Sequence, residues 1–266
     1  MDGAWQALQG DFSRSLKHQN FLVTETNAQT LGWDSSMQFP PYDGQLRLDV
    51  YTDVSSGANM VEYWHWHSIH AGQETYWKGV LSHDLEPNRA YAEVSRIAHE
   101  LQKIGPQLVN MAIRNDVAIL YSPDSSNAIS FMPYATAELG WTPGRAAGAY
   151  GATVKQLHNA LYKANVGADF VFPATTDFSQ YKLLVISSLY VADDALLRRI
   201  SEYVHNGGHV LIPSRAALRT RTQPCAGRRR PVHCVRQPAS LIKNFLTSRS
   251  RFLFAALPST WKRATR

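Results

Sequence analysis

The sequence predicts an α/β protein of two units followed by a basic tail. Apolar segments of strand length alternate with segments whose apolar residues recur every three or four positions, which is the pattern of α/β domains. The strands of the second unit are almost continuously apolar, as in a parallel sheet covered on both faces. We therefore expect units at residues 1–112 and 113–212 and a tail at 213–266.

Charge separates the tail from the rest of the chain. Thirteen of the 27 Lys and Arg residues lie between Ser214 and Arg266, where Asp and Glu are absent, so the first 213 residues hold 14 basic and 21 acidic residues. A hydrophobic content of 44% is typical of a globular protein. No apolar run approaches the roughly 18 residues of a membrane helix, and the start, MDGAWQALQGDF, does not resemble a signal peptide. We expect no membrane partner, and a cytoplasmic location is favoured although the sequence does not establish it.

The first unit should alternate strands with helices. Leu46, Val50 and Val54 recur at a spacing of four, which indicates a helix. The segment FLVTET reads as a buried strand, and NMVEYWHW reads as a second strand with an aromatic end. The expected elements are a strand at 21–26, a helix at 43–56, a strand at 59–66, an aromatic-rich loop at 67–91 and an amphipathic helix at 92–108.

The second unit repeats the alternation and suggests a flavodoxin-like or Rossmann-like domain. Asp193 can cap a helix whose apolar face is Leu196, Ile200 and Val204, and Gly207-Gly208 should end it. The expected elements are a strand at 116–122, a loop at 123–145, a helix at 150–164, strands at 168–173 and 181–187, the helix after 193 and a strand at 209–212.

Carboxylates and indoles gather after the two strands of the first unit. Glu25 ends the first strand, Trp64 and Trp66 end the second, and Glu74 and Trp77 follow in the long loop. Taken singly, a strand-end Glu is most often a solvated rim residue and a Trp most often packs in a core. Together they are typical of a sugar site, where indoles pack on the C–H faces of a pyranose and carboxylates bind hydroxyls or act on the anomeric carbon.

Three segments carry a resemblance to a known family. NFLVTETNAQTLGW, VEYWHWHSIHAGQETYWKGVLSHD and EVSRIAHELQKIG resemble the closing quarter of the barrel in family 42 β-galactosidases, and the second unit is similar to that family's flavodoxin-like trimerisation domain. The resemblance covers residues 3–212. It implies an incomplete C-terminal quarter of a (β/α)₈ barrel, hydrolysis of terminal β-D-galactosyl residues, a β-galactoside substrate, a homotrimer in intact members and no cofactor.

The resemblance also assigns roles to residues. Glu25 matches the nucleophile, which must be ionised to attack, while a second carboxylic acid about 5–5.5 Å away protonates the leaving oxygen. Trp33 matches a residue that lines the galactose pocket, and Glu74 matches a carboxylate that binds sugar hydroxyls. Trp64 and Trp77 are further candidate substrate-binding residues, although some relatives carry His in place of Trp77.

The second catalytic carboxylate is not found. In the family it lies in an Asn-Glu pair after the fourth barrel strand, and no Asn-Glu pair occurs in this sequence. A complete barrel needs about 250 residues, and the chain supplies its last two strand–helix units, so Met1 reads as an internal start. We expect a chain that is inactive alone, with a residual trimerisation scaffold or a pseudogene product as the alternative.

The tail reads as a frameshifted product. Arg, Pro and Ser dominate it, and no periodic pattern continues after Ile212. A nucleic-acid-binding arm is the rival interpretation, but no groove-reading motif accompanies the charges, so no nucleic-acid partner is expected. Cys225, His233 and Cys234 fall short of a closed zinc site, and we expect no metal.

Overall fold

A computed structural model describes residues 3–30, 32, 36, 39–131, 149–212, 219–220 and 252–253. The chain divides into two compact units, Met1–Arg114 and Asn115–Arg266. None of the helices in the described part of the chain combines the length and the apolar character that a membrane span requires.

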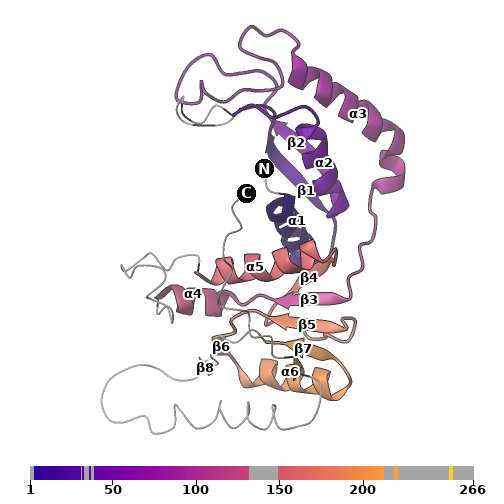
Figure 1. Cartoon of the computed structure of the whole chain (residues 1–266), viewed down its shortest axis with the longest axis vertical. Helices are drawn as coiled ribbons and strands as arrows, with labels where there is room; N and C mark the ends of the chain where they lie inside the picture. The colour runs from indigo at the N-terminus through magenta and orange to yellow at the C-terminus, as the bar shows by residue number, and fades with distance from the viewer. Residues whose placement is uncertain are drawn as a thin grey trace, which may run out of the picture. The chain divides into compact units, whose positions relative to one another are not determined.

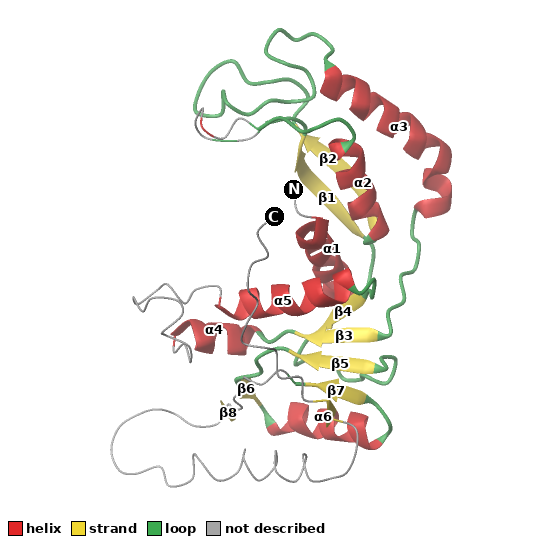
Figure 2. Cartoon of the chain, viewed as in Figure 1, coloured by secondary structure: helices red, strands yellow, loops and turns green. Residues whose placement is uncertain are grey.

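The described residues of the first unit form two parallel strands and three helices, which are labelled in Figure 1. The sequence analysis did not anticipate the first helix, but it anticipated the other four elements. They are α1 (Gly3–Lys17), β1 (Phe21–Asn27), α2 (Gln45–Ser55), β2 (Ala58–Trp64) and α3 (Arg89–Leu108). The long loop between β2 and α3 was expected, and it is shown in green in Figure 2.

One face of β2 packs on helices and the other face does not. Val61 and Tyr63 pack against a core that α2 and α3 supply through Leu46, Val50, Ala90 and Ile97. The side chains that alternate with them, Met60, Glu62 and Trp64, are exposed.

The prediction of a buried strand at 21–26 is therefore wrong in its burial, although the strand exists. Leu22 is 57% exposed. Within the described residues β1 pairs only with β2, and no described element covers the face that carries Leu22.

The second unit is a parallel sheet in the order β4-β3-β5-β7-β9. The chain adds one strand on one side of β3 and then continues on the other side, which is the flavodoxin-like order and confirms the predicted fold class. The strands are β3 (Val117–Leu120), β4 (Ala168–Val171), β5 (Leu183–Ile186), β7 (His209–Leu211) and β9 (Phe252–Leu253). Figure 1 shows the first four side by side.

Helices cover both faces of this sheet. Leu120, Leu184 and Val210 share a core with Leu196 and Ile200 of α6 (Asp194–His205). Phe170 stacks on His158 of α5 (Ala149–Lys163), with ring centroids 6.1 Å apart. As predicted, the Asp193 side chain accepts a hydrogen bond from the Leu196 N–H, and α6 ends just before Gly207.

The predicted loop at 123–145 is wrong in its first part, because α4 (Pro123–Phe131) is a helix. Pro123 stands at its first position, where a missing N–H costs nothing, and the Ser122 Oγ accepts a hydrogen bond from the Ser125 N–H. A Ser-Pro pair at this point can start a helix, but the Gly and Pro residues further along the stretch favoured the prediction of a loop. Residues 132–148 lie outside the described residues.

Most of the tail lies outside the described residues, including Cys225, His233 and Cys234. Two short segments of it are described. Phe252–Leu253 forms β9 beside β7, and Arg219–Thr220 forms β8, which pairs with β6 (Val191–Ala192).

Candidate functional site

The carboxyl ends of β1 and β2 form the edge on which the predicted site residues lie. Asn27 and Trp64 are opposite each other in the ladder. Just before them the register shifts, so that Thr24 and Glu25 face the single residue Glu62. Such bulges re-aim side chains and are frequent beside active sites. Glu25 is exposed at this bulge.

The loop after β2 folds back on itself, and backbone hydrogen bonds join its beginning to its end. The Val80 N–H donates to the His65 oxygen at 2.7 Å, and the Leu81 N–H donates to the Trp66 oxygen at 2.8 Å. The buried Ser68 hydroxyl donates to the Leu81 oxygen and accepts from the Gly79 N–H. The peptide bond between Trp64 and His65 is cis.

Gly79 is required at the centre of this fold-back. A Cβ at this position would lie 2.4 Å from the His65 backbone oxygen and 2.7 Å from the His67 carbonyl carbon. Real Cβ atoms do not approach backbone so closely, so only glycine lets the two segments meet.

The loop after β1 is joined to the same structure. The Gln29 side chain donates to the Gly79 oxygen at 2.6 Å, and the Lys78 N–H donates to the Thr30 oxygen at 3.0 Å. Both loops leave the carboxyl ends of their strands, so these bonds hold the loop after β1 against the loop after β2.

Four of the five predicted site residues lie on these segments. Glu25 is exposed, and Trp64 is 40% exposed at the last position of β2. Glu74 and Trp77 are half-buried in the loop, and the backbone N–H of Trp77 donates to the backbone oxygen of Glu74 at 2.9 Å. Trp33 lies outside the described residues.

Sequence reasoning missed a row of histidines beside these residues. The rings of His65 and His67 have centroids 6.5 Å apart, those of His67 and His70 are 6.2 Å apart, and those of His70 and His83 are 5.8 Å apart. We call these four residues the histidine chain. The run WHWHSIH carries a visible signal for three of them, whereas the position of His83 depends on the folding back of the loop.

His65 has an unusual environment. Its side chain lies at the end of β2, edge-on to the Trp64 ring with centroids 5.0 Å apart. Both ring nitrogens are buried and have no hydrogen-bond partner. Burial lowers the pKa of His65, the nearby His67 lowers it further, and the charge of Glu74 opposes these effects.

A second group of carboxylates lies on the helix-covered side of β2. Asp49 and Asp53 of α2 and Glu93 of α3 are each less than 9% exposed. Burial raises the pKa of Asp49 to about 6, and the charges of Asp53 and Glu93 also raise it. Burial and the same three carboxylates raise the pKa of Tyr63. These groups lie in the core beneath the helices, away from the exposed strand face.

In the second unit, the usual ligand position of a doubly wound sheet is filled. Ligands of such folds bind at the carboxyl ends of the strands where the strand order reverses, here beside β3 and β5. The Tyr150 hydroxyl accepts from the Ser122 N–H at 2.7 Å and contacts the Ser187 hydroxyl at 2.9 Å. All three residues are at most 1% exposed, so the chain's own side chains occupy this position.

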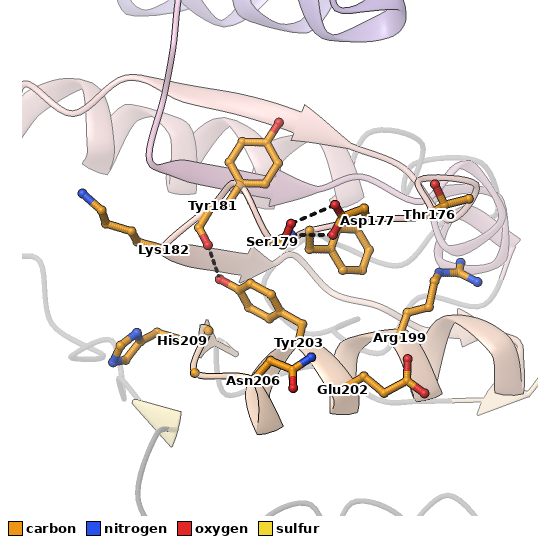
Figure 3. A pocket seen from close by; sticks show the side chains of 13 residues that line it. Thr176, Asp177, Ser179, Tyr181, Lys182, Arg199, Glu202, Tyr203, Asn206 and His209 are labelled. Atoms are coloured by element: carbon orange, nitrogen blue, oxygen red, sulfur yellow. Dashed lines mark hydrogen bonds between the residues drawn. The ribbon is translucent and has the colours of Figure 1, made fainter.

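A cavity of about 440 Å³ lies at the opposite, amino-terminal edge of that sheet (Figure 3). Its walls come from residues 176–182, from the end of α6 and from His209. Asp177 accepts hydrogen bonds from the Ser179 N–H and hydroxyl, and the Tyr203 hydroxyl donates to the Tyr181 oxygen. The hydrogen bonds from Ser179 hold the pKa of the Asp177 carboxyl below its usual value, so this carboxylate is a weak base for the hydroxyl that it contacts.

Within the described residues, no group of three or more His, Cys, Asp or Glu side chains is arranged to hold a metal ion. The histidine rings instead bond to backbone carbonyls where they have a partner.

Comparison with known families accounts for both units. A family model described as β-galactosidase, of glycoside hydrolase family 42, matches residues 2–104. A second, described as β-galactosidase trimerisation domain, matches residues 115–231 and so extends past residue 212.

Individual relatives give the same result. The chain is 26% identical to β-galactosidase BgaA of Clostridium cellulovorans over 235 residues, which are 88% of this chain and 34% of that protein. It is 29% identical to β-galactosidase BgaB of a Geobacillus species over 209 residues, 77% of this chain and 29% of that protein. The chain therefore spans about a third of the length of the relatives it matches.

Solved structures agree on the fold. A β-galactosidase from the haloarchaeon Halorubrum lacusprofundi superposes with a TM-score of 0.68 and 25% identity, covering 79% of this chain and 29% of that one. A β-galactosidase from the psychrophilic Marinomonas ef1 gives 0.73 and 21% identity over 90% of this chain and 35% of that one.

Proposed function

Since the chain belongs to glycoside hydrolase family 42, the β-galactosidases, we propose that it carries one half of a retaining catalytic apparatus, with Glu25 as the nucleophile. One observation carries the assignment. Glu25 is exposed in a bulge at the carboxyl end of β1, on the edge that also bears Trp64. A nucleophile must be reachable by the sugar, and an exposed position meets this need.

The chemistry requires two carboxyl groups. The Glu25 carboxylate attacks the anomeric carbon of a terminal β-galactoside, and the bond to the glycosidic oxygen breaks as an acid gives that oxygen its proton. Water then attacks the anomeric carbon of the galactosyl-enzyme and loses a proton to the same group, so that the bond to Glu25 breaks and galactose leaves with retained anomeric configuration. The second carboxyl group must stand about 5–5.5 Å from the first.

The other predicted residues bind the sugar in this proposal. The Trp64 and Trp77 indoles, together with Trp33, pack on C–H faces of galactose, and the Glu74 carboxylate accepts hydrogen bonds from hydroxyls. The folded-back loop supports these roles because it fixes Glu74 and Trp77 on a backbone held by hydrogen bonds to the His65 and Thr30 oxygens.

A polypeptide of these 266 residues should not hydrolyse ordinary galactosides by itself. Its sequence has no Asn-Glu pair to supply the acid, and general acid catalysis is typically worth about 10² to 10⁴-fold in rate. The measurement is release of p-nitrophenol from its β-galactoside by the purified chain. Clear turnover that Glu25→Gln abolishes would contradict the proposed inactivity and leave the nucleophile assignment standing.

A chimaera tests the nucleophile assignment directly. Residues 1–112 of this chain would replace the matching segment of the BgaA β-galactosidase, whose remaining sequence supplies the rest of the enzyme. We expect Glu25→Gln to reduce the chimaera's activity by at least about 10³-fold, because the covalent step is lost. The exposed Glu86→Gln serves as the matched control and should keep activity. An active chimaera that tolerates Glu25→Gln would refute the assignment.

A second candidate function is a residual trimer-forming scaffold. It is favoured by the match of residues 115–231 to a β-galactosidase trimerisation domain. Light scattering coupled to size exclusion should give about three times the 29.8 kDa chain mass. A monodisperse monomer would reject this candidate, and heterogeneous aggregate would do so as well.

A further inference from the structure

The edge of β2 that faces away from β1 is open in the described part of the chain. The two strands form a two-stranded parallel sheet. Each strand of such a sheet carries backbone N–H and C=O groups on its outer side that have no strand partner, and these groups are a template on which another strand pairs.

An apolar groove of about 380 Å³ lies along the first half of β2, between this strand and the last turns of α3. None of the described residues that line the groove is charged. Met60 and Val109 are exposed at its walls, so the groove is open to a partner. Its other large apolar residues are Val54, Val61, Leu101 and Leu108.

The two walls of the groove are fastened to each other. The Asn59 side-chain N–H donates to the Asn110 side-chain oxygen at 2.8 Å, and the Asn110 backbone N–H donates to the Asn59 side-chain oxygen at 3.0 Å. These bonds hold the segment that follows α3 against β2. A groove that is already shaped in the free chain costs a partner little ordering on binding.

The chemistry of the groove favours an apolar strand as its occupant. A strand paired with β2 turns alternate side chains to its two faces, so one set enters the groove and the other set joins the exposed Leu22 and Met60. Both environments are apolar, and strands of parallel sheets are apolar on both faces. The basic segment 214–266 does not suit this surface, because its charges would be buried without partners.

A second copy of the chain is a poorer occupant than a strand of different sequence. The copy's open strand is β1, and in the register that β1 adopts with β2 its Glu25 would lie beside Glu62. Like charges opposite each other on neighbouring strands are destabilising.

The relatives contain further strands outside the part that this chain matches. The strands β1 and β2 and most of α3 lie within residues 2–104, which match the family 42 β-galactosidase model, and the chain spans 34% of BgaA. A complete barrel has eight parallel strands, and the described residues supply two of them.

We propose that the groove and the open edge of β2 form a docking surface for an apolar strand, parallel to β2, from the part of a family 42 catalytic domain that lies outside the match to this chain. The surface binds this strand even when a separate polypeptide supplies it. The inference rests on the groove and on family membership, and it does not require Glu25 to be the nucleophile.

Co-expression tests the docking surface. The partner is the N-terminal part of BgaA that ends where its match to this chain begins, and it carries an affinity tag. We expect the 266-residue chain to co-purify with this fragment in equimolar amounts. Hydrogen exchange of the peptide 58–64 should slow at least about tenfold in the complex, since edge amides gain partners, while the peptide 117–120 of the second unit should not change. The same fragment with the remaining part of BgaA is the positive control.

Variants at the wall of the groove test where the fragment binds. Val109→Asp should weaken binding by at least about tenfold, because the interface would bury an unpaired charge. The matched control is Leu85→Asp, which places the same charge at an exposed apolar position in the loop after β2 and should bind as the unmodified chain does. Glu25→Gln should also bind normally, so a failed nucleophile test leaves this result unchanged.

The chimaera described above gives a second measurement that needs no separate fragment. Val109→Asp should leave the melting temperature of the free chain unchanged, because the residue is exposed there. In the chimaera the groove is covered, so the same change should lower the melting temperature by at least about 2 °C, whereas Leu85→Asp should not.

The docking surface is refuted if the fragment binds the remaining part of BgaA but not this chain, or if Val109→Asp destabilises the chimaera no more than the free chain. Protection of the peptide 58–64 in the chain alone that disappears on tenfold dilution would identify a second copy as the occupant, and the proposal would be wrong.

Discussion

Asp49 carries the clearest cost of burial in the first unit. It is 8% exposed, and burial together with Asp53 and Glu93 raises its pKa to about 6. A carboxyl group with a raised native pKa keeps a proton that the unfolded chain has already lost. The free energy of unfolding therefore falls as pH rises from about 4 to about 6 and stays reduced above that.

Asp49→Asn should remove this cost, because the amide has no charge to desolvate. We expect the variant to be more stable at pH 7.5 by on the order of 1–3 kcal/mol, and the gain should vanish near pH 4, where the native carboxyl is protonated. Urea unfolding followed by circular dichroism at both pH values measures it. The exposed Asp84→Asn is the control, and an equal gain at both pH values would argue against a titrating Asp49.

At the scale of single elements, the N-terminal cap of α6 is a feature that sequence and structure share. The Asp193 carboxylate accepts the Leu196 N–H at 2.7 Å, satisfying one of the free donors at the helix start. Asp193→Ala should destabilise the second unit by about 1 kcal/mol, whereas Asp193→Asn should retain most of the cap. Thermal unfolding of both variants provides the comparison. Equal melting temperatures for the alanine and asparagine variants would show that the capping hydrogen bond does not stabilise the second unit.

Elements with a local signal could be predicted, and elements defined by tertiary partners could not. The spacing of Leu46 and Val50 is one local signal, and the cap of Asp193 on the helix that follows it is another. Each signal spans only a few residues, so α2 and α6 could be predicted. α4 was missed because the Gly and Pro residues of the stretch 123–145 favour a loop. The exposed face of β1 was missed because apolar composition does not tell which neighbours a strand has.

The candidate site follows the same division. The sequence and the resemblance it carries placed Glu25 and Trp64 at the ends of the strands and Glu74 and Trp77 in the following loop. The structure has all four at the carboxyl ends of β1 and β2 or in the loop after β2. The bulge at Glu25 and the close approach at Gly79 depend on register and on contacts between backbone segments. Such contacts leave no periodic trace in a sequence.

At the scale of the whole chain, the two units differ in how well their strands are enclosed. The strands β3 and β5 each have a neighbour on both sides, and β3 is at most 7% exposed throughout. The β1–β2 pair has two strands in the described residues, and Leu22 and Met60 are 57% and 38% exposed. Two-stranded sheets are marginal unless other elements pack on them, and open edges invite association with other chains.

Native-state hydrogen exchange should reveal this difference. Amides of β3 and β5 exchange through the rarest openings, because opening them exposes a core enclosed by α5 and α6. Amides of β1 need only separate from β2, so we expect them to exchange at least about 100-fold faster, after correction for intrinsic rates, in line with the wide range of local opening free energies within one protein. The comparison uses peptides from residues 21–27 and 117–120 by mass spectrometry at low protein concentration. If β1 proves as protected as β3, its exposed face is covered in solution, and repeating the measurement at a tenfold dilution shows whether another copy of the chain covers it.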